Sequence, residues 1–230
     1  MKNGNTILKS VIFITVFWVA SLNSSALSQE LPFTSHPAPD TSDGWRDLML
    51  PDLSNSTFKE GSWSMDKGVL TWHEPKSYIW TVDRYGDFIL DMEYMVSKGA
   101  NSGVFFRTDD LNNYVQTGIE VQIHETTDNS KYGSCGSIYD CMPARKNVAK
   151  KAGEWNRYTI TCIDNKIYVV HNGVQIIDMD LNKWTEPRRN PDGTSNKFNT
   201  AYKEMPREGH IGFQDHGQPV WFRNMKINKL

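Results

Sequence analysis

The sequence contains only three cysteines, and no pair of them has the spacing of a zinc site. It has no run of Lys and Arg, and its formal net charge is -2, which argues against nucleic acid and anionic membranes as partners. Its longest apolar run, residues 11–22, has 12 residues, too few for a membrane-spanning helix. These absences predict a protein without a cysteine metal site and without a membrane or nucleic-acid function.

The N-terminus has the pattern of a secretory signal peptide. Lys2 and Lys9 come before or at the start of the apolar region, and the small-residue stretch that follows it ends before Gln29. We therefore predict export, to the periplasm or the extracellular medium, with residues 1–28 removed. Cleavage removes two lysines and no acidic residue, so the net charge changes from -2 to -4.

Export places the cysteines in an oxidising compartment, where two of the three can pair. Cys135 and Cys141 flank five residues and are near enough in sequence to close a small loop. We therefore predict a disulfide between them. Cys162 alternates with two other core-type residues and is predicted to be a buried free thiol.

No segment after the signal peptide keeps a helical period of 3.6 residues. Residues 29–43 are rich in Pro and Ser and predict a flexible tether. From residue 44 to 230, many short alternating segments predict an all-β domain, a two-sheet sandwich of the jelly-roll kind. Residues 180–207 interrupt this pattern with a long polar segment, and loops of that length are more often functional than idle.

Residues 118–125, GIEVQIHE, raise the central question of the sequence. As a strand they place Val121 and Ile123 on one face, and Glu120, Gln122 and His124 on the other. A row of three polar side chains could be a solvated face of a sheet. It could equally line a pocket.

Two further segments have the same division into an apolar and a polar face. Arg107 shares a face with Phe105, and Gln214 shares one with His216. If these strands belong to one sheet, their polar side chains converge with those of residues 118–125. Two simpler interpretations remain: Arg107 could pair with an acidic residue across strands, and Asp215 lies on the face opposite His216 in a regular strand.

A comparison with laminarinase-type glucanases narrows the chemistry. Those sandwiches carry glutamates at alternating strand positions, and retaining glycosidases need two carboxylates. Here the row reads Glu120, Gln122, His124, which lacks the second carboxylate. Glu120 could instead act as a general base, or Glu120 and a histidine could bind a divalent metal ion with other oxygen ligands.

Several motifs in order resemble one known family. They are NSGVFFR (residues 101–107), GIEVQI (118–123), GSIYD (136–140), GEWN (153–156), NPDGTSNKF (190–198), EGHIGFQDHG (208–217) and VWFRNMKI (220–227). Together these motifs resemble the 3-keto-disaccharide hydrolase family, which has a concanavalin A-like sandwich fold. The resemblance extends from about residue 44 to the C-terminus.

The resemblance implies chemistry on a sugar that a partner dehydrogenase has already oxidised at C3. It implies a base near C2, so we predict Glu120 as base or metal ligand, His216 as proton carrier or metal ligand, and Arg107 as the holder of a sugar or ketone oxygen. A divalent metal ion bound by Glu120 and His216 would stabilise the enolate. The remaining predicted substrate-binding residues are Asn101, Gln122, His124, Tyr139, Asp140, Gln214 and Asp215.

The alternative function is a non-catalytic carbohydrate-binding domain on the same fold, because a fold does not determine its function. A binding groove uses aromatic platforms and neutral hydrogen-bonding groups, whereas a buried set of Glu, Arg and His is costly unless it does chemistry. The two hypotheses therefore differ in what surrounds Glu120.

Overall fold

The computed structural model describes Met1 and residues 35–125 and 130–230. The chain divides into two units, Met1–Glu30 and Leu31–Leu230, and every helix and strand named below lies in the second. Within the described residues, no helix is long and apolar enough to cross a membrane.

Two antiparallel sheets make up the second unit. The strands of the larger sheet are, in spatial order, β11 (Val174–Asp180), β10 (Lys166–His171), β9 (Asn156–Ile163), β6 (Phe88–Val96), β13 (Val220–Lys229), β4 (Val69–Trp72) and β3 (Trp63–Asp66), and β1 (Trp45–Asp47) also pairs with β13. Those of the smaller sheet are β2 (Ser56–Thr57), β5 (Ile79–Thr81), β12 (His210–Phe213), β7 (Asn101–Thr108) and β8 (Ile119–His124). The short helices are α1 (Tyr114–Thr117), η1 (Pro39–Thr41), η2 (Leu111–Asn113), η3 (Leu181–Lys183) and η4 (Tyr202–Glu204).

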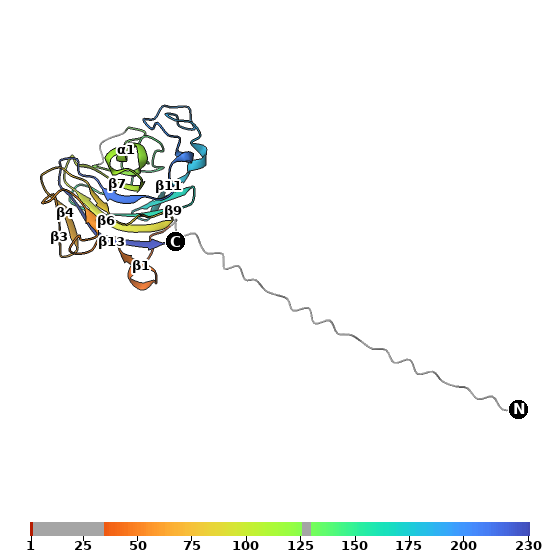
Figure 1. Ribbon diagram of the computed structural model, residues 1–230, viewed down its shortest axis with the longest axis horizontal. Coiled ribbons are helices and arrows are strands. Elements are labelled where there is room, and N and C mark those ends of the chain that lie inside the picture. Colours follow the sequence, from red (N-terminus) through yellow and green to blue (C-terminus); the bar gives the residue numbers. More distant parts are fainter. Residues whose placement is uncertain (2–34, 126–129) are drawn as a thin grey trace. The chain divides into compact units, whose positions relative to one another are not determined.

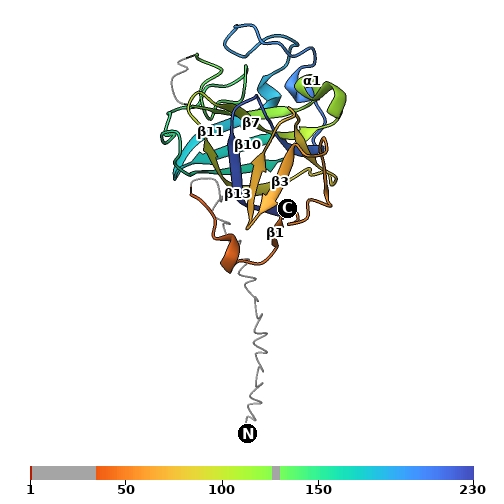
Figure 2. The same cartoon turned by 90° about the vertical axis from the view of Figure 1, so that its left-hand side faces the viewer.

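The two sheets stack face to face, with α1 and β1 at opposite sides of the sandwich (Figure 1; Figure 2). The apolar positions of each strand meet between the layers, as period-two alternation requires. In β8, Ile119, Val121 and Ile123 are buried in this core, and in β6 Leu90 and Met92 are buried there too. The predicted all-β two-sheet sandwich is confirmed.

Part of the predicted tether contacts the outer face of the larger sheet. His36 Nδ1 lies 2.8 Å from Thr159 Oγ1, and the backbone N–H of Gly173 donates to His36 Nε2 over 2.8 Å. Arg157 donates to the carbonyl of Pro37 over 2.8 Å. Residues 36–37 are therefore held against β9 and the β10–β11 turn.

A second histidine lies inside the sandwich. His171 is buried, its Nε2 lies 3.0 Å from the Tyr94 hydroxyl, and its ring packs 4.4 Å from that of Tyr158. The pKa of His171 is lowered to about 3, mainly by burial and further by the neighbouring His36 and Lys150. The folded protein therefore holds this imidazole neutral well below its ordinary titration range.

We expect this neutral imidazole to make the fold sensitive to acid. As the pH falls below about 6.5, the unfolded chain binds a proton at His171 that the folded chain does not bind until about pH 3, so the free energy of unfolding decreases by about 5 kcal/mol across that interval. Denaturant unfolding at a series of pH values would measure this. His171→Gln should have a shallower slope than the wild type, and the exposed His73→Gln should match the wild type. Equal slopes for all three proteins would contradict the prediction.

Candidate active site

A cavity of about 160 Å³ lies on the face of the smaller sheet that points away from the core. It is smaller than the ~300 Å³ at the lower end of pockets for drug-sized ligands, so it suits a single ring. Its walls come from β7, β8, the end of β12, α1 and two loops. The lining residues are Asn101, Phe105, Val115, Glu120, Gln122, Tyr139, Lys197, Gln214 and His216.

The pairing of β7 with β8 brings the polar side chains of Glu120 and Gln122 to this cavity. Phe105 pairs with Glu120, Gly103 with Gln122, and Asn101 with His124. A Cβ added at Gly103 would collide with Oε1 of Glu120, so only glycine allows the carboxylate to lie across β7. The predicted alternation of β8 is confirmed, because Glu120 and Gln122 line the cavity while the residues between them enter the core.

The opposite edge of β8 is covered by residues 136–139. The N–H of Gln122 donates to the carbonyl of Ser137, and the N–H of Tyr139 donates to the carbonyl of Glu120, each over 3.0 Å. These bonds place Tyr139 beside Glu120 at the cavity wall. Lys197 Nζ then lies 4.1 Å from the centre of the Tyr139 ring, a cation–π contact.

Lys197 belongs to the long polar loop between β11 and β12, and backbone contacts fix its position. Its N–H donates to Oδ2 of Asp140 over 2.8 Å, and its carbonyl accepts from Gln116 on α1 over 3.1 Å. The carbonyl of Asp140 also accepts from Asn190 over 3.1 Å. Asp140, predicted to bind substrate, is not among the cavity residues and instead holds the loop that delivers Lys197.

Glu120 is the one carboxylate among the described residues that line the cavity. Among the described residues, none forms a hydrogen bond or an ion pair with its side chain, although Lys197 exerts an electrostatic attraction on it. Burial raises the pKa of Glu120 to about 8, and the charge of Lys197 lowers it in part. The group therefore titrates near neutral pH, where it can both accept and release a proton.

Gln214 and His216 reach the cavity from just beyond the end of β12. The side-chain amide of Gln214 donates from Nε2 to the Tyr78 hydroxyl over 3.1 Å, and the Tyr114 hydroxyl bonds the same oxygen over 3.1 Å. Both tyrosine rings belong to an aromatic cluster on the outer face of this sheet, completed by Trp80 and Phe105. His216 is exposed at the cavity wall.

The prediction for Arg107 is wrong. Arg107 is 1% exposed and donates from Nε to the carbonyl of Gly86 over 3.0 Å, from a terminal nitrogen to the carbonyl of Asp164 over 2.6 Å, and from the other to Asp87 Oδ1 over 3.0 Å. The cause is a bulge: β7 has one more residue than β12 between two paired positions, and the φ of Arg107 is 50°. The side chain of Arg107 therefore turns inward and contacts the residues that precede β6 and the turn between β9 and β10.

Asp215, also predicted to bind substrate, serves a structural purpose. Its side chain is buried and accepts from the N–H of Ser77 over 3.2 Å and from the N–H of Gly217 over 2.6 Å. β12 ends at Phe213, so Asp215 caps the turn that carries His216. Of the two neighbours, His216 lines the cavity and Asp215 does not.

His124 is the last residue of β8, two residues beyond Gln122. It is half-buried, and its Nδ1 is a buried atom without a hydrogen-bond partner in the described part of the chain. It does not line the cavity, although its register partner Asn101 does. The predicted contact of His124 with substrate stays a prediction.

The disulfide predicted between Cys135 and Cys141 is not formed. Both thiols are free and buried. Cys135 Sγ lies 3.3 Å from the Tyr94 hydroxyl and 3.4 Å from the Tyr158 hydroxyl, so it faces the core rather than its neighbour in sequence. Burial raises the pKa of Cys141 to about 12, and that of Cys162 likewise to about 12, so neither is a reactive thiolate at neutral pH.

Metal binding by Glu120 and His216 also stays a prediction. Both side chains line the cavity. In residues 35–125 and 130–230, however, no three His, Cys, Asp or Glu side chains are grouped so that they could hold a metal ion. Any ion here would depend on neutral oxygen ligands for the rest of its coordination.

Residues 40–228 match the family described as 3-keto-alpha-glucoside-1,2-lyase-like domains. The chain belongs to this family. The match covers the sandwich and includes every residue that lines the cavity. The resemblance inferred from the motifs is therefore confirmed.

Two relatives of this lyase-like domain have names that refer to hydrolysis of sugars. A Bacteroides thetaiotaomicron protein named 3-keto-disaccharide hydrolase is 28% identical over 173 residues, which are 64% of this chain and 60% of the relative. The chain thus spans about 60% of the length of that curated relative. A proposed glycosyl hydrolase from Parabacteroides distasonis is 35% identical, with a TM-score of 0.77 over 81% of this chain and 99% of that one.

A more distant structure shares only the fold. The carbohydrate-binding module CBM66 from Bacillus subtilis has a TM-score of 0.51 at 9% identity, and the match covers 79% of this chain and 99% of the module. The sandwich architecture of the lyase-like domain thus also occurs in a sugar-binding module.

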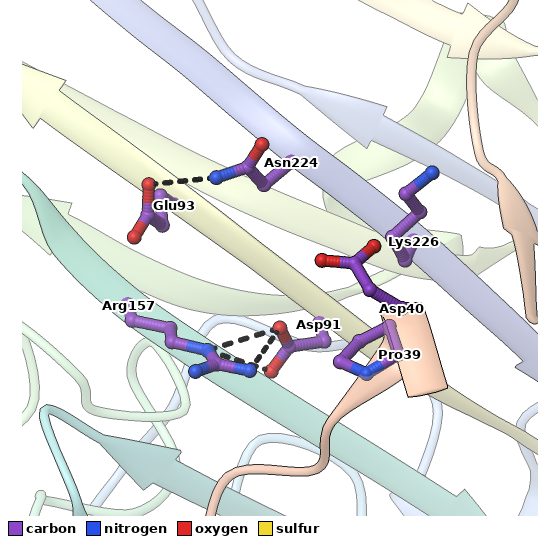
Figure 3. Close-up of a pocket in the computed structure, with 7 residues that line it drawn as sticks. All are labelled: Pro39, Asp40, Asp91, Glu93, Arg157, Asn224 and Lys226. Carbon is purple, nitrogen blue, oxygen red and sulfur yellow. Dashed lines mark hydrogen bonds and ion pairs between the residues drawn. The ribbon is translucent and has the colours of Figure 1, made fainter. Parts of the chain in front are cut away.

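A second cavity of about 130 Å³ lies on the outer face of the larger sheet, beneath η1 (Figure 3). Its charged side chains Asp91, Glu93 and Arg157 are already paired. Arg157 Nη2 lies 2.8 Å from Asp91 Oδ1, Thr159 donates to the same carboxylate over 2.5 Å, and Glu93 accepts from Asn224 over 3.1 Å. This pocket of the lyase-like domain lies where residues 36–40 contact the sheet, whereas the carboxylate of the first cavity has no partner among the described residues.

Proposed function

We propose that the chain is an exported enzyme that cleaves 3-keto-glycosides, 3-keto-disaccharides included, by removing the C2 proton of the oxidised sugar. The family description and the name of the curated relative both refer to 3-keto sugars. The observation that carries the proposal is Glu120, a single carboxylate without a described partner, in a ring-sized cavity, with its pKa raised to about 8. A carboxylate in that range is a general base suited to neutral pH.

The proposed reaction needs one base and no oxidant. The C3 ketone acidifies the C2 proton, because the negative charge formed on its removal spreads onto the ketone oxygen. Glu120 takes the proton, and the C–H electron pair becomes the C2–C3 double bond of an enolate. Re-formation of the C3 carbonyl then moves a pair into a C1–C2 double bond, and the C1–O bond breaks with its electrons on the leaving oxygen. In net hydrolysis, water adds across C1–C2 afterwards.

The other polar groups of the cavity suit the charges that this reaction creates. Lys197 is a cation within electrostatic range of Glu120 and is proposed to stabilise the enolate oxygen. His216 is exposed at the wall and is proposed to supply the proton that the leaving oxygen needs. A single carboxylate among the described lining residues also fits, because elimination does not require the pair that retaining and inverting glycosidases use.

The proposed reaction does not form the C3 ketone, so its substrate requires a prior oxidation. A ketone at C3 requires removal of two electrons and two protons from a secondary alcohol, so a sugar 3-dehydrogenase is the proposed upstream partner.

The test is release of the leaving group from a chromogenic 3-keto-glucoside, compared with the unoxidised glucoside. We expect cleavage of the keto form alone. The same assay after treatment with a chelator, and after adding back divalent ions, tests the predicted metal. Cleavage of both sugars at equal rates would contradict C2 proton abstraction. Binding of the sugars without cleavage of either would instead support the carbohydrate-binding alternative.

Lys197→Met is expected to move the pH dependence of the enzyme. Lys197 lowers the pKa of Glu120, so its removal should raise the apparent pKa of kcat/KM above its wild-type value near 8. The rate below that pH should therefore fall further than the rate at high pH. The measurement is a pH–rate profile from pH 5.5 to 9.5.

The exposed Lys183 lies on the same loop and provides the control. Lys183→Met should leave both the apparent pKa and the plateau rate unchanged. If Lys197→Met leaves the apparent pKa unchanged as well, Lys197 does not act on the base.

A further inference from the structure

The geometry points to a basis for substrate specificity within this cavity. Three side-chain amide oxygens bind the hydroxyl groups of a neutral sugar ring and disfavour anionic sugars. This inference rests on the proposed function, because it names the substrate class of the same site. The three groups are the side-chain carbonyls of Asn101, Gln122 and Gln214.

These oxygens share an uncommon property. In the described part of the chain, three side-chain amide oxygens are buried without a hydrogen-bond partner, and all three belong to residues that line this one cavity. Gln122 is 4% exposed and Gln214 is 9% exposed. A buried polar atom without a partner is costly, so three in one cavity indicate groups kept for a ligand.

The orientation of Gln214 is fixed from several sides. Its side-chain Nε2 donates to the Tyr78 hydroxyl over 3.1 Å. Its backbone N–H donates to the carbonyl of Gly103 over 3.0 Å, and its backbone carbonyl accepts from the Ser102 hydroxyl over 2.7 Å. The amide nitrogen is thus held by the aromatic cluster. The amide oxygen is left as the group that Gln214 offers to a ligand.

Gln122 is held equally firmly. Its backbone N–H donates to the carbonyl of Ser137 over 3.0 Å. Its backbone carbonyl accepts from the N–H of Gly136 over 2.8 Å and from the Tyr158 hydroxyl over 3.0 Å. With its backbone bonded on both sides, the side chain projects from a rigid strand. Rigid acceptors cost little reorganisation when a ligand binds.

A set of hydrogen-bond acceptors favours ligands that carry donor groups over ligands that carry a negative charge. Sugar hydroxyls donate to it, whereas a carboxylate or sulfate brings further acceptors against these oxygens and against Glu120. A hard cation such as Ca²⁺ also takes amide oxygens, but such sites draw most of their affinity from several carboxylates. The described lining of this cavity contains one carboxylate, and the Lys197 cation lies within its electrostatic range. Hydroxyl groups are therefore the better match.

The test crosses protein variants with substrate analogues. Gln122→Met and Gln214→Met each remove one acceptor at nearly constant size, and Gln175→Met, on the larger sheet, is the matched control. Each protein is assayed on a 3-keto-glucoside, on its 4-deoxy and 6-deoxy analogues, and on the corresponding 3-keto-glucuronide. The same matrix is measured by calorimetry as binding, so that failure of the proposed cleavage leaves the specificity measurable.

We expect each cavity variant to lose on the order of tenfold to hundredfold in kcat/KM or affinity on the parent sugar, but much less on the one deoxy analogue that lacks its partner hydroxyl. The glucuronide should be at least tenfold poorer than the glucoside for the wild type. Gln122→Met should also be at least as stable to heat as the wild type, since it removes a buried acceptor without a partner. Equal losses on all sugars, equal use of the glucuronide, or Ca²⁺ binding that both variants abolish would overturn the inference.

Discussion

Replacing Glu120 by glutamine is expected to abolish cleavage of the 3-keto substrate and, at the same time, to stabilise the fold. The loss in kcat/KM should be about 10²–10⁴-fold, the usual contribution of a positioned general base. The gain in stability follows from burial. Because the folded state raises the pKa of Glu120 to about 8 from an ordinary value of 4.5, ionisation opposes folding throughout that interval.

The sign and window of this stabilisation are specific. Below about pH 4.5 both states bind the proton and the carboxyl has no linked cost; as the pH rises toward 8, the unfolded state alone loses it and the fold is destabilised. Glutamine cannot ionise, so Glu120→Gln should be more stable than the wild type by about 4 kcal/mol at pH 8, or roughly 8–16 °C in Tm. The difference should shrink toward pH 5.

Glu125→Gln is the matched control, because its carboxylate is one residue beyond the end of β8 and accepts from the N–H of Gly99 over 2.8 Å. It should retain activity and gain no stability at pH 8. A Glu120→Gln protein that is less stable than the wild type at every pH would show that Glu120 is a structural residue. Full activity in that variant would remove it as the base.

Arg107→Met is expected to damage the fold and not the chemistry. The substitution leaves the carbonyls of Gly86 and Asp164 without the Arg107 donor and removes a donor to Asp87 Oδ1, which also accepts from the N–H of Asp164. Hydrogen bonds from a charged donor contribute about 1.5–3 kcal/mol each, and Gly86 and Asp87 are half-buried while Asp164 is exposed, so we expect a total loss of about 3 kcal/mol in the free energy of unfolding. For a domain of this size, that is roughly 6–12 °C in Tm.

Chemical denaturation and kinetics at a temperature where the variant is folded would check this. Arg84→Met provides the comparison, because Arg84 forms an exposed ion pair with Asp109 over 2.6 Å and should cost less than about 1 kcal/mol. The folded Arg107→Met protein should keep kcat/KM within a few-fold of the wild type. Normal stability with a hundredfold loss of activity would restore Arg107 to the active site.

The sequence predicted the sandwich and the polar face of β8 because both follow from alternation, which holds wherever a strand is regular. Val121 and Ile123 enter the core, and Glu120 and Gln122 line the cavity, as period two requires. The same rule failed for Arg107, because a bulge in β7 inserts a residue and reverses the side on which the arginine lies. A bulge has no reliable signal in a single sequence.

The other discrepancies arise from contacts between segments far apart in the chain. The length of the loop that carries Lys197 predicts a function but does not indicate this residue, because its position depends on the bonds of its backbone to the side chains of Asp140 and Gln116. Cys135 and Cys141 are near in sequence, yet Cys135 faces two core tyrosines. Sequence spacing alone does not determine which way such loop side chains point.

The most direct test of the account is the primary isotope effect at C2. A 3-keto-glucoside with deuterium at C2 would be compared with the protium form in single-turnover experiments, so that substrate binding and product release do not mask the chemical step. The account predicts markedly slower cleavage of the deuterated sugar, because Glu120 breaks the C2–H bond before or as the C1–O bond breaks. Equal rates, together with cleavage of the unoxidised glucoside, would contradict it and indicate direct displacement at C1.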